Sequence, residues 1–300
     1  MSVPKPSSAA AVWWQAIRPR TLALSVSPVI AGAALAVASA GTFRLDASLI
    51  AGLGAMAIQI GTNLHNDAAD FLNGTDQPGR IGPPRVTEQG WLPAETVKRA
   101  AHVAFTLAAL AGLFLATLGG WPILLVGLAS VLAGYAYSAG PRPISRGPFG
   151  EVMVIGFFGL AAVGGTYWLN TGQLDAAALA LGLIVGLPAA AVLLVNNTRD
   201  LDNDRAAGRR TLAILLGRQS AGQVYDALLG ATFGGLLTLA LLAPGTGGAL
   251  LGLAALPAAA KAARAFREAG DGAAFNRCLG ATARVQVVLT LALAAGLVIF

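Results

Sequence analysis

The chain has 300 residues, of which 56% are hydrophobic and only 11% are charged, and its formal net charge is +6. A soluble domain carries roughly a quarter charged residues, so the composition excludes an ordinary water-soluble fold. In a membrane protein the basic excess is more simply a topology signal than a nucleic-acid surface, and we expect no nucleic-acid partner.

Apolar stretches of about 20 residues, the length that spans a bilayer as a helix, recur along the whole chain. The sequence therefore predicts an all-α, polytopic membrane protein, a bundle of nine transmembrane helices with cytoplasmic cap loops. We expect a single domain over 1–300, in which residues 1–15 form a flexible segment. The predicted spans are, in chain order, 21–40, 47–66, 97–118, 121–140, 150–170, 174–198, 222–243, 246–265 and 279–299.

The basic residues indicate the orientation of these spans. With the N-terminus in the cytoplasm, every Lys and Arg except Arg44 falls in an inner segment or near the inner end of a span, as Arg284 does in the last one. Cytoplasmic loops of membrane proteins carry such an excess of positive charge. We therefore expect a multi-pass protein of the cytoplasmic (inner) membrane, whose working face is cytoplasmic.

The second predicted span ends in a cluster of polar side chains, "NLHNDAADFLNGTD", over residues 63–76. Asn66 and Asp70 are four residues apart, so a helix places them on one face. Asp67 is expected to point elsewhere, and Asp76 is expected in the loop that follows.

A second cluster, "NNTRDLDNDRAAG", ends the sixth predicted span. Asn196, Asp200 and Asp204 follow one another at intervals of four, so they share one face if the helix continues through them. Asp202 would then point away from that face.

Both clusters place acidic side chains where a helix end and a bilayer disfavour them. A helix C-terminus favours cations, and an Asp within the hydrocarbon costs about 2.5–3.5 kcal/mol on insertion scales. One such cluster is equally well explained as a solvated helix end, but two at matched depth favour a functional site. Oxygen ligands suit a hard cation such as Mg²⁺, and a chain with only His65 and His102 disfavours zinc.

Arginines flank both clusters. Each one alone is more simply a positive-inside charge, but Arg is also the preferred planar partner of phosphate oxygens. The chain has no G-x-x-x-x-G-K-[ST] motif, which argues against a P-loop nucleotide hydrolase. Two Asp-rich clusters at the end of an apolar bundle indicate instead a lipid diphosphate, and a reaction in which Mg²⁺ helps diphosphate leave an allylic carbon. The candidate diphosphate-binding residues are Arg80, Arg85, Arg199, Arg209 and Arg210.

Several segments resemble the UbiA superfamily of intramembrane prenyltransferases. The two Asp-rich clusters are similar to the two characteristic motifs of that family. The variants "GTD" followed by "RIGP", and "NNTRD", resemble the branch that prenylates 1,4-dihydroxy-2-naphthoate. Further similar segments are "RPRTLALSVSPVIAG", "YAYSAGPRPISRGPFGEV" and "LGATARVQ", so the resemblance covers nearly the whole chain.

This resemblance implies a cytoplasmic cap over a Mg²⁺–diphosphate site. It also implies transfer of a polyprenyl chain from an allylic polyprenyl diphosphate to dihydroxynaphthoate, with loss of CO₂ and diphosphate, giving demethylmenaquinone. Gly74 departs from the family pattern, because many relatives carry an acid there. By resemblance the metal ligands are Asn66, Asp70, Asp76, Asn196, Asp200 and Asp204, of which Asp70, Asp200 and Asp204 are the candidate catalytic residues.

Two kinds of alternative function stay open from the residues alone. Another acceptor is possible: 4-hydroxybenzoate, homogentisate, a chlorin or a lipid. A cation-coupled transporter would also hold acids inside a helical bundle, but its polar groups should reach the bilayer midplane. The sequence leaves the prenyl chain length and the oligomeric state open.

A few further residues have two interpretations. Arg18 and Arg20 either anchor the first span at the inner surface or contact the acceptor carboxylate. Tyr135 and Tyr137 either pack between helices or line the path of the allylic cation. The long loop 73–96, rich in Gly and Pro, is expected to close over the bound diphosphate.

Overall fold

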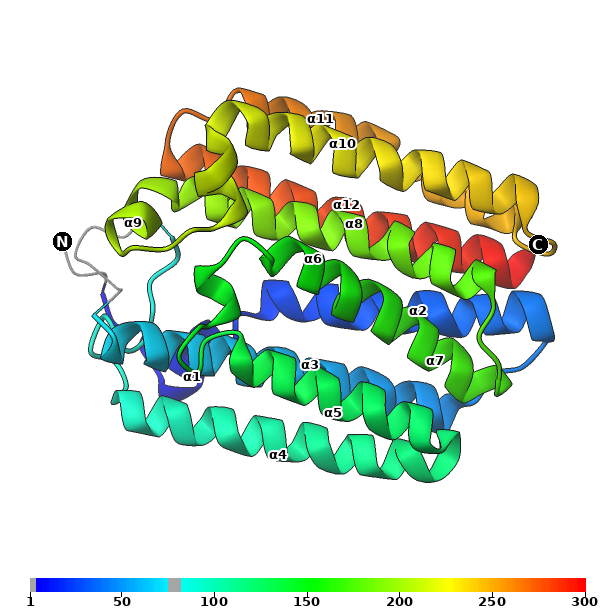
Figure 1. Cartoon of the computed structure of the whole chain (residues 1–300), viewed down its shortest axis with the longest axis horizontal. Coiled ribbons are helices and arrows are strands. Elements are labelled where there is room, and N and C mark those ends of the chain that lie inside the picture. The colour runs from blue at the N-terminus through cyan, green and yellow to red at the C-terminus, as the bar shows by residue number, and fades with distance from the viewer. Residues whose placement is uncertain (1–3, 75–81) are drawn as a thin grey trace.

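The computed structural model describes residues 4–74 and 82–300, and all regular secondary structure in these two ranges is helical (Figure 1). Three elements depart from α-helical geometry: η1 and η3 are 3₁₀ helices, and η2 is a π-helix. In chain order the elements are α1 (Ala9–Ile17), α2 (Pro19–Ala40), α3 (Leu45–Leu72), α4 (Ala94–Gly119), α5 (Trp121–Ala136), η1 (Ile144–Arg146), α6 (Gly150–Val154), η2 (Ile155–Ala161), α7 (Ala162–Thr171), α8 (Ala176–Arg199), α9 (Leu201–Ala206), α10 (Leu212–Leu242), η3 (Gly247–Ala255), α11 (Leu256–Arg267) and α12 (Gly272–Ile299).

Eight segments in the described ranges are long and apolar enough to cross a membrane. They are α2, α3, α4, α8, α10 and α12, together with the combined segments α6–η2–α7 and η3–α11. The remaining predicted span, 121–140, forms the shorter apolar helix α5. The largest shift in a boundary is at α10, which begins at Leu212 rather than at 222 and is kinked at Gly217. The protein is a multi-pass membrane protein.

The long helices run side by side along the long axis of the molecule (Figure 1). At one end lie α1, α9 and the C-terminal ends of α3 and α8, whereas the C-terminus of the chain lies at the opposite end (Figure 1). We call the first of these the α9 end. The ends of α3 and α8 carry the two polar clusters, so both clusters lie at the same end of the bundle.

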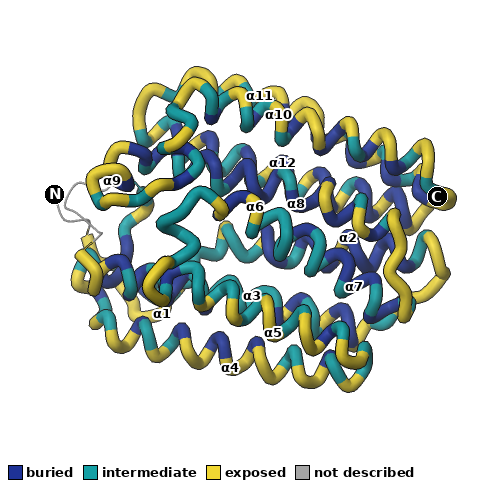
Figure 2. The backbone as a smooth tube through the Cα atoms, viewed as in Figure 1, coloured by how far each residue is buried: buried dark blue, intermediate teal, exposed yellow. Residues whose placement is uncertain are grey.

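The spans differ in how far they are buried (Figure 2). In the most apolar window of α8, 72% of the residues are buried inside the protein, compared with 28% in α4. The outward face of α4 exposes Leu107, Leu110 and Leu113. Such a face is stable in lipid rather than in water, which agrees with a bilayer around the bundle.

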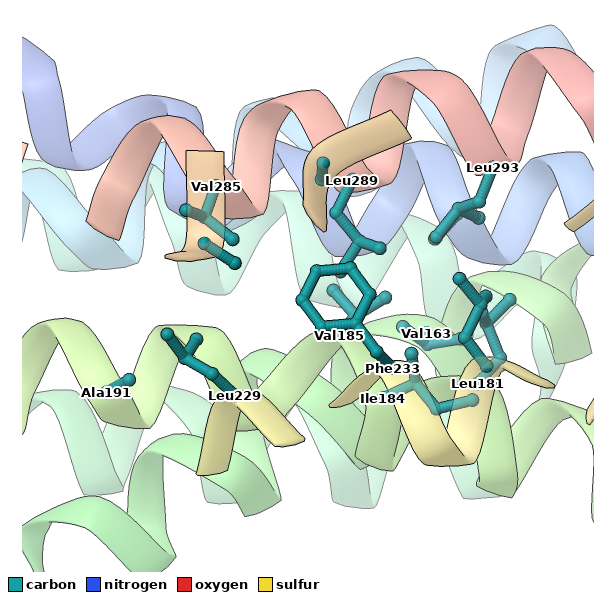
Figure 3. Close-up of a cluster of buried hydrophobic side chains, with 14 of the residues drawn as sticks. Val163, Leu181, Ile184, Val185, Ala191, Leu229, Phe233, Val285, Leu289 and Leu293 are labelled. Carbon is teal, nitrogen blue, oxygen red and sulfur yellow. The ribbon is translucent and has the colours of Figure 1, made fainter. Parts of the chain in front are cut away.

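The largest buried cluster joins α8, α10 and α12 (Figure 3). Side chains from these three helices, among them Val185, Phe233 and Leu289, fill the space between them. Close packing also depends on glycine, because a Cβ at Gly159 in η2 would overlap the carbonyl oxygen of Gly182 in α8. Small residues that let backbones approach are typical of helix contacts in membranes.

A proline inside α2 is compensated by a side chain from α12. Pro28 has no N–H group, so the carbonyl oxygen of Leu24 loses its usual partner within the helix. The side-chain amide of Gln286 donates to that oxygen at 3.3 Å. This contact ties the first span to the last one at a point where lipid could not satisfy the backbone.

The N-terminal segment 1–15, predicted to be flexible, contains most of an ordered helix. Ser8 caps α1 by accepting a hydrogen bond from the N–H of Ala11. Val12 and Ala16 are buried in a cluster that includes Leu64 of α3. Residues 9–15 therefore form part of a helix whose apolar face packs against α3.

Candidate active site

A cavity of about 810 Å³ lies inside the bundle. Along most of its depth it is lined by apolar side chains, and the π-helix η2 contributes Phe157 and Phe158 to its wall. Single π-helical turns inside helices occur frequently at functional sites. The polar lining is concentrated toward the α9 end and comprises Arg18, Asn63, Asn66, Asn196, Arg199 and Asn276, among others.

The first cluster is held by arginines from two other parts of the chain. Asp70, near the end of α3, is buried, and its two carboxylate oxygens accept different partners. Arg85 donates to Oδ2 at 2.6 Å, and Arg209 donates to Oδ1 at 2.7 Å. Two guanidinium cations thus neutralise this carboxylate. A buried carboxylate is stable only when a partner offsets its charge.

The second cluster is organised around an arginine of its own. Arg199 contacts both carboxylate oxygens of Asp200, from Nε at 2.9 Å and from Nη2 at 2.6 Å. The same guanidinium donates to Asn196 at 2.8 Å and to Asn276 of α12 at 2.8 Å. Two predicted ligands, Asn196 and Asp200, are therefore fixed by one buried side chain.

Arg209 joins the two clusters. Its Nη2 contacts Asp70 of the first cluster at 2.7 Å, and its Nη1 lies 3.3 Å from Oδ1 of Asp204 in the second. Burial disfavours the charge of Arg209, but the carboxylates of Asp70 and Asp204 raise the pKa of its guanidinium above the ordinary value. The structure thus brings together carboxylates that are far apart in the sequence, within reach of one guanidinium.

The helix does not run without interruption through the second cluster. α8 ends at Arg199, and Asp200 has φ −90° and ψ 6° before α9 begins. The N–H of Asp204 still donates to the carbonyl oxygen of Asp200 at 2.8 Å, so the helical register is kept. Asp204 is buried, whereas Asp202 is exposed and pairs with Arg218 at the surface. Asp202 therefore points away from the cluster, as predicted.

Asp67 does not line the cavity. Its buried carboxylate turns to the loop after α3, where it accepts hydrogen bonds from the N–H of Val86 at 3.2 Å and of Thr87 at 3.4 Å. It also contacts the hydroxyl of Thr87. The loop 73–96, predicted as an irregular lid, is therefore folded and anchored in this part.

Two predicted site residues, Asp76 and Arg80, lie outside the described residues. Arg210 is described and exposed. Its backbone N–H donates to the carbonyl oxygen of Arg146 at 2.8 Å. The structure therefore gives Arg210 no contact with the carboxylates that its neighbour Arg209 joins.

The residues with two interpretations separate clearly. Arg18 and Arg20 both line the cavity, but Arg18 is partly buried and has a left-handed backbone, φ 54°, whereas Arg20 is exposed at the cavity mouth. Burial, and then the nearby charge of Arg85, lower the pKa of the Arg18 guanidinium. Tyr137 lines the cavity, but Tyr135 packs against the ring of His65 with centroids 4.8 Å apart.

The donor set suits a hard cation. The described residues offer carboxylate and amide oxygens at the polar end of the cavity, and the buried Oδ1 of Asn66 has no hydrogen-bond partner. With the arginines placed as they are, no three His, Cys, Asp or Glu side chains among the described residues are grouped to hold a metal ion. The oxygen chemistry of this donor set therefore fits Mg²⁺.

Analysis of the sequence missed Asn276, which reaches the second cluster from the first turns of α12. An asparagine beside Arg277, at the inner end of a long apolar helix, was the available signal. Its partner Arg199 could not be identified from spacing, because the two residues are 77 positions apart.

Comparison with known proteins places these features in a wider context. The model of the UbiA prenyltransferase family matches residues 25–277. The chain is 36% identical to 1,4-dihydroxy-2-naphthoate octaprenyltransferase of Mycobacterium leprae over 96% of each chain. It is 35% identical to the Escherichia coli protein of the same name over 76% of this chain and 75% of that one. Its fold is similar to that of a UbiA homolog from Archaeoglobus fulgidus bound to DMAPP and Mg²⁺, with a TM-score of 0.65, 14% identity and coverage of 94% and 99%.

Proposed function

The chain belongs to the UbiA prenyltransferase family, and from this premise we propose that it transfers a polyprenyl chain from an allylic polyprenyl diphosphate to 1,4-dihydroxy-2-naphthoate. CO₂ and diphosphate are lost, and the immediate product is the hydroquinone form of demethylmenaquinone, an intermediate of menaquinone biosynthesis; its oxidation to the quinone is a separate step. The observation that carries the proposal is the meeting of two Asp-rich clusters at the polar end of a deep apolar cavity. The names of the relatives support the acceptor.

The diphosphate lies, in this proposal, between the two clusters. Mg²⁺, when bound, offsets the negative charge that develops on the departing diphosphate. In this proposal the chain holds Mg²⁺ with oxygens from both helix ends. The Oδ1 of Asn66, which has no hydrogen-bond partner among the described residues, supports this assignment. The ligands proposed are Asn66, Asp70, Asn196, Asp200 and Asp204, with Asp76 as a further acid outside the described residues.

The arginines offset the remaining negative charge of the site. Arg85, Arg199 and Arg209 now neutralise the carboxylates directly. With metal held by the carboxylates, these guanidinium groups would be free to bind the oxygens of the diphosphate, for which their planar geometry is suited. Charges aimed at the leaving group then stabilise it as the allylic C–O bond breaks and the electron pair moves to the diphosphate oxygen.

The apolar part of the cavity holds the prenyl tail and keeps water away from the allylic cation. Phe157 and Phe158 line this part, so the cation forms beside aromatic side chains rather than beside water. A carbon of the acceptor ring then forms the new C–C bond, and the carboxylate leaves as CO₂ with its bonding electrons returned to the ring.

Arg18 is the residue that we assign to the acceptor carboxylate. Its guanidinium lines the cavity close to both clusters. No hydrogen bond of its side chain is found within the described residues, in contrast to Arg85, Arg199 and Arg209. A partly buried cation of this kind is suited to a carboxylate that arrives with the substrate.

We place the α9 end on the cytoplasmic side of the inner membrane, together with the N-terminal helix α1. The basis is the distribution of charge, because the arginines of the clusters and of α11 gather at the inner ends of the spans. Substrates made in the cytoplasm and in the inner leaflet would then reach the site from the same side.

The decisive experiment uses membranes from cells that express the protein. They are incubated with an allylic polyprenyl diphosphate and either dihydroxynaphthoate or 4-hydroxybenzoate, with and without Mg²⁺. We expect a prenylated, decarboxylated product from dihydroxynaphthoate only, and only with the cation. Product from 4-hydroxybenzoate alone would replace the acceptor in this proposal, and no product from either would overturn it.

A further inference from the structure

The hydrogen bonds of the buried Asp67 carboxylate found among the described residues all come from the loop that follows α3. One oxygen, Oδ2, accepts from the N–H of Val86 at 3.2 Å, and the other, Oδ1, faces the N–H and the hydroxyl of Thr87. The side chain of Thr87 also lies 3.2 Å from the backbone carbonyl oxygen of Asp67. Asp67 and Thr87 are 1% and 2% exposed, so these contacts are shielded from water.

The loop around these contacts is compact. Val86 is fully buried in the cluster formed by α1, α3 and α4, and its carbonyl oxygen accepts hydrogen bonds from the N–H groups of Trp91 and Leu92. Gly90 closes the turn with φ 68°, a conformation that glycine adopts without strain. Asp67 therefore fastens an ordered turn to α3.

The residue next to this anchor is Arg85, whose guanidinium contacts Asp70 one turn further along α3. Asp67 and Asp70 thus hold the same loop in two ways, one through backbone N–H groups and the other through a side chain. In the function proposed above, Asp70 must exchange Arg85 for a metal ion. Asp67 keeps its hydrogen-bond partners when the metal binds, because its carboxylate faces the loop and not the cavity.

We propose that Asp67 is a positioning residue for the diphosphate. It fixes the backbone at Val86 and Thr87, so that Arg85 stays within reach of the diphosphate after Asp70 has released it. This inference rests on the proposed function and deepens it. It divides the first cluster into Asp70, which binds the metal, and Asp67, which holds the arginine that binds the leaving group.

Two pairs of variants test the anchor with minimal change in volume. Thr87→Val removes the hydroxyl, whereas Thr87→Ser keeps it. Asp67→Asn turns an amide toward one of the two N–H donors and so breaks one hydrogen bond. The matched controls are Thr238→Val, whose hydroxyl bonds only its own helix, and Asp226→Asn, in an exposed pair with Arg267.

The first readout does not depend on turnover. Purified protein in detergent is titrated with inorganic diphosphate and Mg²⁺, and binding is followed by the rise in Tm. Trypsin provides a second readout, because cleavage after the buried Arg85 requires the loop to detach. We expect Thr87→Val and Asp67→Asn to bind diphosphate about tenfold more weakly and to be cleaved after Arg85, with Thr87→Ser and both controls like the wild type.

Steady-state kinetics separate positioning from general damage. The KM for the prenyl diphosphate should rise about tenfold in Thr87→Val, while the KM for the acceptor stays within twofold. Equal rises in both values, or unchanged diphosphate binding in a folded Thr87→Val protein, would overturn the inference. If the wild type itself fails to bind Mg²⁺ and diphosphate, the proposed function falls and the inference falls with it. Should Asp67→Asn not fold, Thr87→Val alone decides the question.

Discussion

The two Asp-rich clusters look alike in the sequence but are built differently. In the first, Asp70 takes its partners from elsewhere in the chain, 15 and 139 residues away. In the second, Asp200 is paired with Arg199, the residue directly before it. Asp70 is therefore a junction between distant segments, whereas Asp200 is held by its direct neighbour, whose guanidinium also reaches Asn276 of α12.

This difference indicates which parts of the chain change their contacts when a ligand binds. Releasing Arg199 from Asp200 changes contacts at the end of α8 and at the start of α12. Releasing Arg85 and Arg209 from Asp70 changes the contacts of the loop after α3 and of the loop after α9 together. We therefore expect loss of the contacts of Asp70 to loosen both loops, and loss of the pair between Arg199 and Asp200 to leave the loop after α3 in place.

Removal of the divalent cation should have the largest effect, because it affects both clusters at once. After treatment with excess EDTA, the activity of membranes should fall to background, since the diphosphate would leave without its counter-charge. Added Mg²⁺ should restore it. Full activity in protein shown to be free of metal would contradict the common role that we give to the two clusters.

Loss of one carboxylate from either cluster should come next. Asp70→Asn and Asp204→Asn keep the size of the side chain but remove a negative charge from the proposed metal site. We expect kcat to fall about a thousandfold, roughly 4 kcal/mol in the activation barrier, with little change in the KM of the acceptor. Near-normal turnover of Asp70→Asn would mean that the first cluster is only a helix end.

A conservative change of the arginine between the clusters should distinguish a junction from a local pair. Arg209→Lys cannot reach Asp70 and Asp204 with two planar donors, so kcat/KM for the prenyl diphosphate should fall about thirtyfold. Arg199→Lys serves as the comparison in the second cluster. Only Arg209→Lys should also expose the loop after α3 to trypsin. If trypsin cleaved both variants equally, the proposed difference between the two arginines would be contradicted.

The smallest effect is expected at Asp202. Its side chain is exposed and pairs with Arg218 at the surface, so Asp202→Asn should change kcat by less than about threefold. Measured beside Asp204→Asn in the same preparation, it tests the register of the second cluster. If Asp202→Asn were as damaging as Asp204→Asn, the inward face of α9 would be assigned wrongly.

The helical class, the spans and the two polar helix ends follow from the order of the residues alone. Stretches of about 20 apolar residues leave a chain in a bilayer no stable choice other than helices. Within one helix the spacing of four also determines neighbours, which is why the opposite orientations of Asp202 and Asp204 were predictable. The oxygen chemistry of the clusters followed directly from residue type.

Which segments meet at the site depends on how the helices pack against one another. Periodicity says nothing about contacts between helices, so the spacing could not show that Arg209 joins Asp70 to Asp204 or that Asn276 reaches Arg199. The same holds for Asp67, whose partners lie about 20 residues away in a loop without a periodic pattern. Packing of α1 against α3 likewise ordered a segment that composition alone marks as flexible. These contacts arise when the bundle closes, because burial then makes each charged group find a partner.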